Sequence, residues 1–305
     1  MTSASDIAEH IAAIAALRWH VDQGMDEVLV DEPGALARAP AVVATAAPID
    51  IVQEAAPSMV SQVAASTTSR VASITTMAPA TGPVQGTPEL KNEAMKLALG
   101  AQTLEELQAA LAGFEGLAIR KTATNMVFCD GNPAAPIMLI GEAPGADEDR
   151  LGRPFVGVSG QLLDKILKCI DLDRTQTDPE RAIYISNILN WRPPGNRTPT
   201  PQEVELSLPF IERHIALVKP KLLIFCGGVS AKALLNTDDG ISKLRGRFHS
   251  YAPLTPGIEI DPIPALATYH PSYLLRTPSQ KKAVWQDMLN LLAKSQELGI
   301  SAKAA

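Results

Sequence analysis

Four short apolar runs constrain the fold of this chain more than any other feature of its sequence. They lie at 137–140, 182–186, 221–226 and 264–268. Amphipathic, helix-like stretches follow them at 159–170, 201–217, 228–235 and 280–295. Strands that alternate with helices in this way predict a parallel sheet covered by helices on both faces. In such sheets ligands bind beyond the carboxyl ends of the strands, so the informative loops are those at 141–158, 187–200, 227–230 and 269–277.

The residues before these runs have a different composition. Residues 5–19 place apolar side chains at three- and four-residue spacings, which predicts one amphipathic helix. From residue 33 to residue 88 the chain is rich in Ala, Pro, Val, Ser and Thr and has four charges in 56 residues, which is typical of a linker. We therefore expect a helical segment at 1–32, a linker at 33–88 and a folded domain at 89–305, which begins with two helices divided at Gly100.

The acidic net charge of −6 does not exclude a nucleic-acid partner, because it is unevenly distributed. The first 88 residues contain nine acidic and three basic residues and so account for the whole of it. The remaining 217 residues contain 24 acidic and 24 basic residues. Any basic surface on the folded domain must therefore be local.

The chain has three widely spaced cysteines, Cys129, Cys169 and Cys226. Their odd number and spacing argue against a disulfide framework and against a paired-cysteine metal site, and we expect each to be a small buried residue. No apolar run approaches 18 residues, and acidic residues stand where a signal peptide would be cationic. These features predict a cytoplasmic protein.

The loop after the first run is dense in glycine, proline and acidic residues. It reads GEAPGADED from Gly141 to Asp149 and RPFVG from Arg153 to Gly157. Four acidic residues in eight positions disfavour a triphosphate cradle, and no Gly-Lys-Ser/Thr follows. A solvated acidic turn remains the alternative to a ligand-binding loop.

Two further loops each contain a polar residue at a strand end. An Asn side chain such as that of Asn187 presents an acceptor beside a donor, which suits a pyrimidine edge with N3–H next to O4, although Asn187 could equally cap a turn. Of the five histidines, His270 alone follows a strand's carboxyl end, and Pro271 is expected to stiffen the loop that presents it. A lone histidine is usually structural, but this position makes His270 a candidate site residue.

Three segments in these loops carry a family resemblance. GEAPGADEDRLGRPFVGVSGQLLDKIL, NILNWRPPGNRTPTPQE and HPSYLLR resemble the uracil-DNA glycosylase superfamily, closest to family 4, over residues 112–295. The resemblance implies an α/β three-layer sandwich with a central four-stranded parallel sheet flanked by helices. It also implies a monofunctional DNA repair glycosylase that flips uracil out of DNA and hydrolyses its N-glycosidic bond to leave an abasic site.

The resemblance also assigns roles to residues. Those expected at the base and the scissile bond are His270 as a donor to uracil O2, Glu142 near the cation-like sugar, Glu148 crowding the pyrimidine C5, Phe155 as a stacking face, Asn187 as the reader of N3–H and O4, and Gly141 and Ala143 in the pocket. Ala143 stands where well-known members carry a water-activating Asp. Those expected at DNA are Ser159, Arg197, Ser272, Leu274, Leu275 and Arg276, with the two leucines as wedges and Arg276 near a phosphate.

Family 4 enzymes normally hold a [4Fe–4S] cluster through four cysteines, and this chain departs from them there. The corresponding positions fall at about Phe114, Leu117, Trp191 and Ser207, none of which offers a thiolate. The sequence therefore predicts no iron–sulfur cluster and no other cofactor or metal.

Two other functions remain possible from the sequence. A relative of the same fold could bind uracil or abasic DNA without turnover, although such a binder would have no need of an oxyanion stabiliser at His270. A nucleotide-binding α/β protein is disfavoured by the missing glycine fingerprint. The expected partners are uracil-containing DNA and its abasic product, with no membrane association, and the expected state is a monomer.

Overall fold

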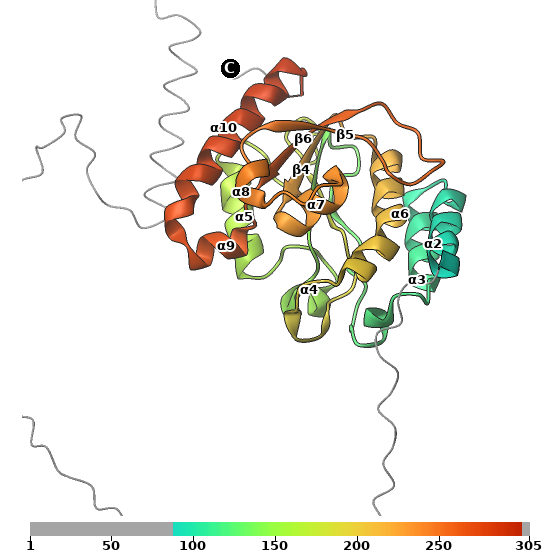
Figure 1. The fold of residues 1–305 in the computed structure, drawn as a ribbon. Helices are drawn as coiled ribbons and strands as arrows, with labels where there is room; N and C mark the ends of the chain where they lie inside the picture. Colours follow the sequence, from blue (N-terminus) through green and yellow to red (C-terminus); the bar gives the residue numbers. More distant parts are fainter. Residues whose placement is uncertain (1–87, 301–305) are drawn as a thin grey trace, which may run out of the picture. The chain divides into compact units, whose positions relative to one another are not determined.

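A six-stranded sheet with the order β1-β3-β2-β4-β6-β5 organises the fold (Figure 1). The computed structural model describes residues 88–300, which belong to one compact unit. The helix predicted at 5–19 and nearly all of the linker predicted at 33–88 lie outside the described residues. The strands are β1 (Asp130–Gly131), β2 (Ile137–Gly141), β3 (Tyr184–Asn187), β4 (Leu222–Cys226), β5 (Phe248–Tyr251) and β6 (Ile263–Thr268).

The four inner strands, β3, β2, β4 and β6, are parallel, as predicted. β2, β3 and β4 are buried along their whole length, and β6 at all but one residue, which explains why they appear in the sequence as continuous apolar runs. β1 and β5 add an antiparallel strand at each edge, which the sequence analysis did not predict. β1 has only two residues and β5 is mostly half-buried, so neither has the pattern of a core strand.

Helices cover both faces of the sheet, which confirms the three-layer arrangement. On one face α6 (Pro201–Val218) and α7 (Gly228–Leu235) pack on the strands, and α2 (Pro88–Gly100) and α3 (Leu104–Gly113) pack on α6. The other face is covered by α5 (Val158–Lys168), α9 (Pro271–Arg276) and α10 (Lys281–Glu297). Two short α-helices, α4 (Ala146–Leu151) and α8 (Ile241–Leu244), and the three 3-10 helices η1 (Ala118–Lys121), η2 (Pro194–Asn196) and η3 (Pro278–Gln280) complete the described helices.

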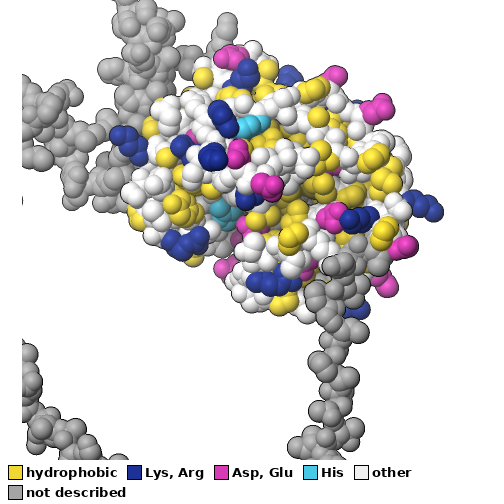
Figure 2. All heavy atoms as spheres, in the orientation of Figure 1, with side chains coloured by type: hydrophobic (Ala, Val, Ile, Leu, Met, Phe, Trp, Pro, Cys, Tyr) yellow, Lys and Arg dark blue, Asp and Glu magenta, His cyan; other side chains and the backbone are white. Residues whose placement is uncertain are grey.

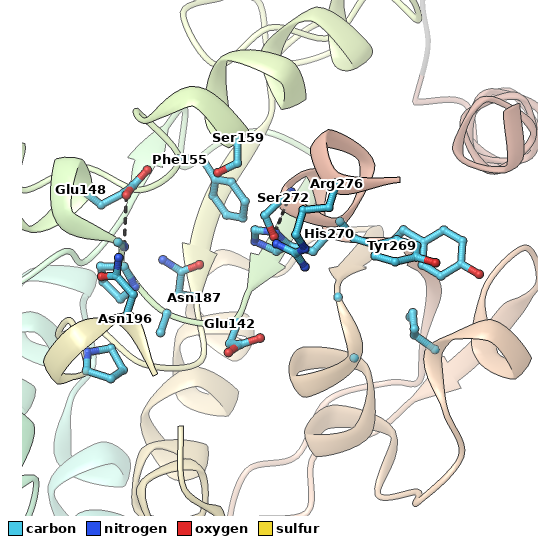
Figure 3. A pocket seen from close by; sticks show the side chains of 18 of the residues that line it. Glu142, Glu148, Phe155, Ser159, Asn187, Asn196, Tyr269, His270, Ser272 and Arg276 are labelled. Carbon is cyan, nitrogen blue, oxygen red and sulfur yellow. Dashed lines mark hydrogen bonds between the residues drawn. The ribbon is translucent and has the colours of Figure 1, made fainter. Parts of the chain in front are cut away.

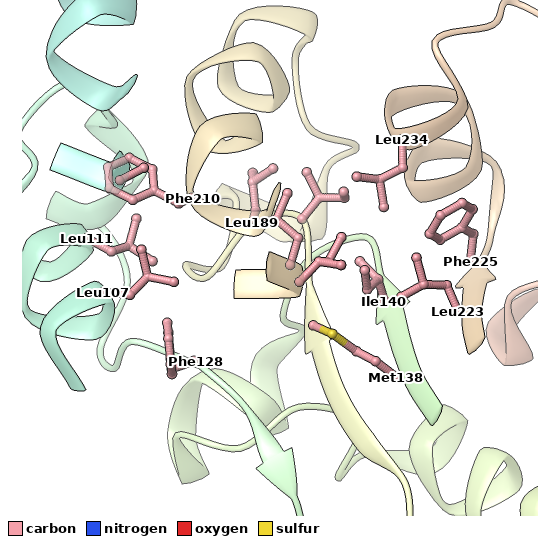
Figure 4. Packing of buried hydrophobic residues seen from close by; sticks show 14 of the residues in the cluster. Leu107, Leu111, Phe128, Met138, Ile140, Leu189, Phe210, Leu223, Phe225 and Leu234 are labelled. Carbon is pink, nitrogen blue, oxygen red and sulfur yellow. The ribbon is translucent and has the colours of Figure 1, made fainter. Parts of the chain in front are cut away.

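Alternate residues of each strand point into two separate cores. In β2, Met138 and Ile140 pack with Leu223 and Phe225 against α6 and α7 (Figure 4). Ile137 and the other alternate residues of β2 enter the core beneath α5 and α10. Burial of each such side chain contributes about 1.5–3 kcal/mol, so the two cores together fix the register of the strands and the loops at their ends.

Local sequence signals mark where several helices begin and end. Thr103 caps α3 by accepting a hydrogen bond from the Glu106 N–H at 3.2 Å, and Thr200 does the same for the Glu203 N–H at the start of α6. α2 and α3 are separated after Gly100, as the sequence predicted. α4 and α9 were not predicted as helices, because each has only six residues and lies within a segment that looks like a loop.

The cysteines differ from the expectation of uniform burial. Cys226 is buried in β4, but Cys129 and Cys169 are partly exposed. Cys169 ends α5, and its sulfur hydrogen-bonds the Lys165 carbonyl at the helix end instead of packing in the core. Within residues 88–300, no helix is both long and apolar enough to cross a membrane.

Candidate active site

A cavity of about 710 Å³ opens where β2, β3, β4 and β6 end (Figure 3). All four loops selected from the sequence contribute to its lining, which confirms that they meet at one edge of the sheet. α8 also reaches the cavity, through Ile241 and Ser242. Sequence reasoning missed α8 because it lies well after the end of β4 and has only four residues.

Asn187 and Phe155 meet above the backbone of Gly141. Gly141 pairs with Asn187 in the β2–β3 register, and the Asn187 side chain enters the cavity with only 2% of the residue exposed. A Cβ atom at position 141 would overlap both the Asn187 Oδ1 atom and the Phe155 ring. The glycine therefore allows an amide and an aromatic face to share the floor of the cavity.

The Phe155 ring also faces His270. The two ring centroids are 5.5 Å apart with an angle of 29° between the planes (Figure 3). Phe155 adopts a left-handed backbone conformation with φ of 53°, which is uncommon for a residue with a side chain. The cavity thus has an aromatic wall whose backbone is held in a strained state.

His270 lines the cavity and is held by Ser272. It is the N-cap of α9, and its Nδ1 atom accepts a hydrogen bond from the Ser272 N–H at 3.2 Å, with the Ser272 hydroxyl 2.8 Å away. Because Nδ1 accepts, the proton of the neutral ring lies on Nε2. Burial, together with the positive charge of Arg276, lowers the pKa of His270 to about 4, against an opposing effect of Glu148.

The two carboxylates of the cavity have different environments. Glu148 is buried, and three backbone N–H groups donate to its oxygens: those of Val156 and Gly157 at 2.9 Å each and that of Gly145 at 3.1 Å. Glu142 is half-buried in the cavity wall, and burial raises the pKa of its carboxyl above the ordinary value. Glu142 is therefore the carboxylate that is available to a ligand, whereas Glu148 holds a loop.

The rim of the cavity contains most of the residues predicted to bind DNA. Ser159, Arg197, Ser272 and Arg276 all line it, and so does Ala143 deeper in. Arg197 donates to both oxygens of Glu203, at 2.8 and 2.6 Å, and the Ser272 hydroxyl is already engaged with His270. On the face shown in Figure 2, basic side chains are interspersed with acidic and apolar ones, as expected for a domain without a global positive charge.

The two predicted wedge residues have opposite environments. Leu275 is 46% exposed on α9, whereas Leu274 is 0% exposed and packs in the core beneath α5 and α10. Burial of Leu274 contradicts the prediction that it enters DNA. Adjacent residues of a helix point in directions about 100° apart, so only one of the two can face outward.

The positions that correspond to the cluster ligands contain side chains that do not fit an iron–sulfur cluster. Phe114, Leu117, Trp191 and Ser207 are all buried, and none of them supplies a thiolate. The Phe114 ring packs on Phe210 with centroids 5.4 Å apart. Within residues 88–300, no group of three or more His, Cys, Asp and Glu side chains is arranged to hold a metal ion.

Two details of this region show how tightly it is packed. The Phe114 ring occupies the space where a Cβ atom of residue 116 would lie, which only Gly116 allows. The Ser207 hydroxyl is buried and has no hydrogen-bond partner among the described residues.

Comparison with known proteins identifies a matching family model and several similar proteins. The model of the uracil DNA glycosylase superfamily matches residues 128–290, which is more than half of the chain. A type-4 uracil-DNA glycosylase of Pyrobaculum aerophilum is 33% identical over 189 residues, which cover 61% of this chain and 91% of that protein. The type-4 enzyme of Archaeoglobus fulgidus is 32% identical, covering 61% and 90%, and that of Thermotoga maritima is 37% identical, covering 52% and 76%.

Proposed function

This chain belongs to the uracil-DNA glycosylase superfamily, and on that premise we propose how its pocket acts on DNA. It is a uracil-DNA glycosylase, a DNA repair hydrolase whose substrate is uracil-containing DNA. The observation that supports the residue roles best is the convergence of the Asn187 amide, the Phe155 ring and the neutral His270 ring in one cavity.

Recognition of the base is assigned to Phe155 and Asn187. A uracil inside a duplex cannot be reached, so the nucleotide must be extruded into the cavity. The Phe155 ring stacks on the flipped base, a contact of about 1–3 kcal/mol in proteins that bind single strands. The Asn187 amide accepts from N3–H and donates to O4; cytosine presents the opposite pattern, so its polar groups would be buried without partners.

Bond cleavage is assigned to His270 and Glu142. The departing uracil carries negative charge, and the Nε2–H of neutral His270 donates to its O2 atom. Glu142 favours the cation-like sugar or orients the attacking water, because Glu148 is already bonded to three backbone amides. Ala143 has no group that could act as a general base. We retain for Glu148 the proposed role of crowding C5 and excluding thymine.

The residues at the rim are assigned to contacts with the DNA backbone and with the gap that the flipped base leaves in the base stack. Leu275 is the exposed apolar residue of α9 and fits the role of wedge. Arg276 and Ser159 line the mouth, where phosphates pass. Arg197 is also assigned to the DNA backbone. Its guanidinium pairs with Glu203, so a contact with a phosphate requires Arg197 to share or exchange that partner.

The catalytic domain is proposed to be residues 89–305, because every cavity-lining residue falls within this range. It is proposed to act without an iron–sulfur cluster or other cofactor, on the grounds of the donor set at Phe114, Leu117, Trp191 and Ser207. The abasic strand is the proposed product. A monomeric, cytoplasmic protein is proposed, and the odd number and wide spacing of its three cysteines suit a reducing compartment.

A single gel assay tests the function. An end-labelled oligonucleotide with one uracil is incubated with the protein and EDTA, treated with alkali and resolved by size. Strand cleavage at the uracil is expected, and a thymine oligonucleotide is the control. Binding of the uracil oligonucleotide without cleavage would favour a non-catalytic relative instead.

A further inference from the structure

Two buried charged side chains, Arg174 and Glu148, hold the backbone of residues 154–157. Arg174 Nη1 donates to the Pro154 carbonyl at 2.7 Å, and its Nη2 donates to the Phe155 carbonyl at 3.0 Å. Glu148 Oε1 accepts from the next two N–H groups, those of Val156 and Gly157. Two carbonyls and two amides in succession are thus bonded to one cation and one anion.

Arg174 itself lies outside the cavity, in the segment between α5 and β3. Its side chain is 5% exposed and also pairs with two carboxylates, Asp164 at 2.7 Å and Asp130 at 3.0 Å. The planar guanidinium serves four acceptors at once, which a point charge such as an ammonium cannot do. Loss of this group would leave two carbonyls and the Asp164 carboxylate without this donor, whereas Asp130 would keep its pairing with Arg153 at 2.9 Å.

The segment held in this way contains the strained residue of the site. Phe155 has a φ of 53°, and such a conformation persists only where the surroundings impose it. The start of α5 contributes to this, since a Cβ atom on Gly160 would overlap the Phe155 backbone. The direction of the Phe155 ring therefore depends on contacts to its backbone, including those from Arg174, which does not line the cavity.

We propose that Arg174 is a positioning residue for base recognition: it fixes the Phe155 backbone so that the ring forms the stacking wall beside His270. The proposal rests on the role assigned to Phe155 in the proposed function. Arg174 touches no substrate, so its effect on excision passes through Phe155. An enzyme with a misplaced wall is expected to bind DNA normally and to lose the extruded base.

A double-mutant cycle tests this dependence. Single-turnover excision is compared for the parent, Arg174→Ala, Phe155→Ala and the double variant, with binding to an undamaged oligonucleotide measured alongside. Arg174→Ala is expected to slow excision about 10- to 100-fold, the size of loss that follows a displacement of about 1 Å at a site. In the Phe155→Ala background the same change is expected to cost less than about threefold, because the wall is already absent.

Two further variants control for folding and charge. Arg174→Lys keeps the positive charge but not the planar guanidinium with its several donors, so an intermediate loss of excision rate is expected. This variant replaces Arg174→Ala in the cycle if Arg174→Ala does not fold. Arg181→Gln removes another arginine of the same segment, one that pairs with the exposed Asp171, and parent-like rates are expected. Equal losses from Arg174 substitution with and without Phe155, or no loss at all, would overturn the proposal.

Amide hydrogen exchange tests the contacts between Arg174 and the backbone of residues 154–155 independently of catalysis. Peptides that cover residues 153–160 are expected to exchange faster in both Arg174 variants and at the parental rate in Arg181→Gln. If the parent protein excises no uracil while this local effect is present, the proposed function fails and the positioning of Phe155 stands. Unchanged exchange in this segment would refute the positioning role even in an active enzyme.

Discussion

Ser272 donates its backbone N–H to Nδ1 of His270 over 3.2 Å, and its hydroxyl lies 2.8 Å from the same nitrogen. This arrangement leaves the Nε2–H of a neutral ring for the base. His270→Ala is therefore expected to slow bond cleavage about 100-fold or more, the effect of removing one donor from an oxyanion site. Single-turnover rates, paired with binding to an uncleavable uracil analogue, separate cleavage from recognition.

Ser272→Ala is the matched control for His270, because it removes the hydroxyl and keeps the backbone donor. A loss of about 1 kcal/mol, or about fivefold in rate, is expected. Cleavage by His270→Ala at the parental rate would show that His270 only caps α9.

Asn187→Asp is expected to weaken discrimination in favour of uracil. An ionised carboxylate offers two acceptors and no donor for O4, and an unpaired buried group costs about 1–3 kcal/mol, or about 5- to 150-fold in rate. The measurement is the ratio of excision rates on uracil and cytosine oligonucleotides. Asn187→Ala controls for the added charge, and an unchanged ratio in both variants would remove Asn187 from base recognition.

Glu142 is expected to govern the acid limb of the pH–rate profile. Burial raises the pKa of its carboxyl, so the rate should rise with pH above the ordinary carboxyl range as Glu142 ionises. His270 does not explain that limb, because its lowered pKa of about 4 keeps it neutral there. Glu142→Gln should be slower and should lose the limb, and a limb that persists in this variant would contradict the assignment.

The neighbouring leucines of α9 give a paired test of DNA contact and packing. Leu275→Ala should lower excision from duplex DNA more than from single strands and leave stability nearly unchanged, because the side chain is exposed. Leu274→Ala should lower the free energy of unfolding by about 2–5 kcal/mol, because it empties a core site. Chemical denaturation and duplex-to-single-strand rate ratios distinguish the two outcomes, and a duplex-specific defect in Leu274→Ala alone would reverse the assignment.

The apolar packing around Phe114 leads to a prediction about metal content. The purified protein should be colourless when isolated anaerobically, and stoichiometric iron and sulfide would refute this. Ser207→Ala should be neutral or stabilising in thermal unfolding, because it removes a buried hydroxyl that has no partner in the described structure. A large loss of stability would instead indicate a bound group at Ser207.

The sequence was sufficient to predict the inner sheet and the loops of the site, but not the contacts that orient the site. The parallel strands are buried on nearly all sides and so leave unbroken apolar runs, whereas the half-buried β5 leaves none. Leu274 and Leu275 could not be told apart, because α9 looked like a loop and its helical phase was unknown. Arg174 and Phe155 are 19 residues apart, and a side chain that bonds a distant carbonyl leaves no periodic signal.

The absence of a side chain at Gly141 limits how this pocket can change. One added methyl group would overlap the side chains of both Asn187 and Phe155, to which we assign base reading and stacking. The base specificity of the enzyme is therefore not expected to change by stepwise enlargement of residue 141, since alanine, the smallest replacement, already overlaps both side chains. A relative that accepted another base would therefore have to change the residues in the walls of the pocket and keep glycine at position 141.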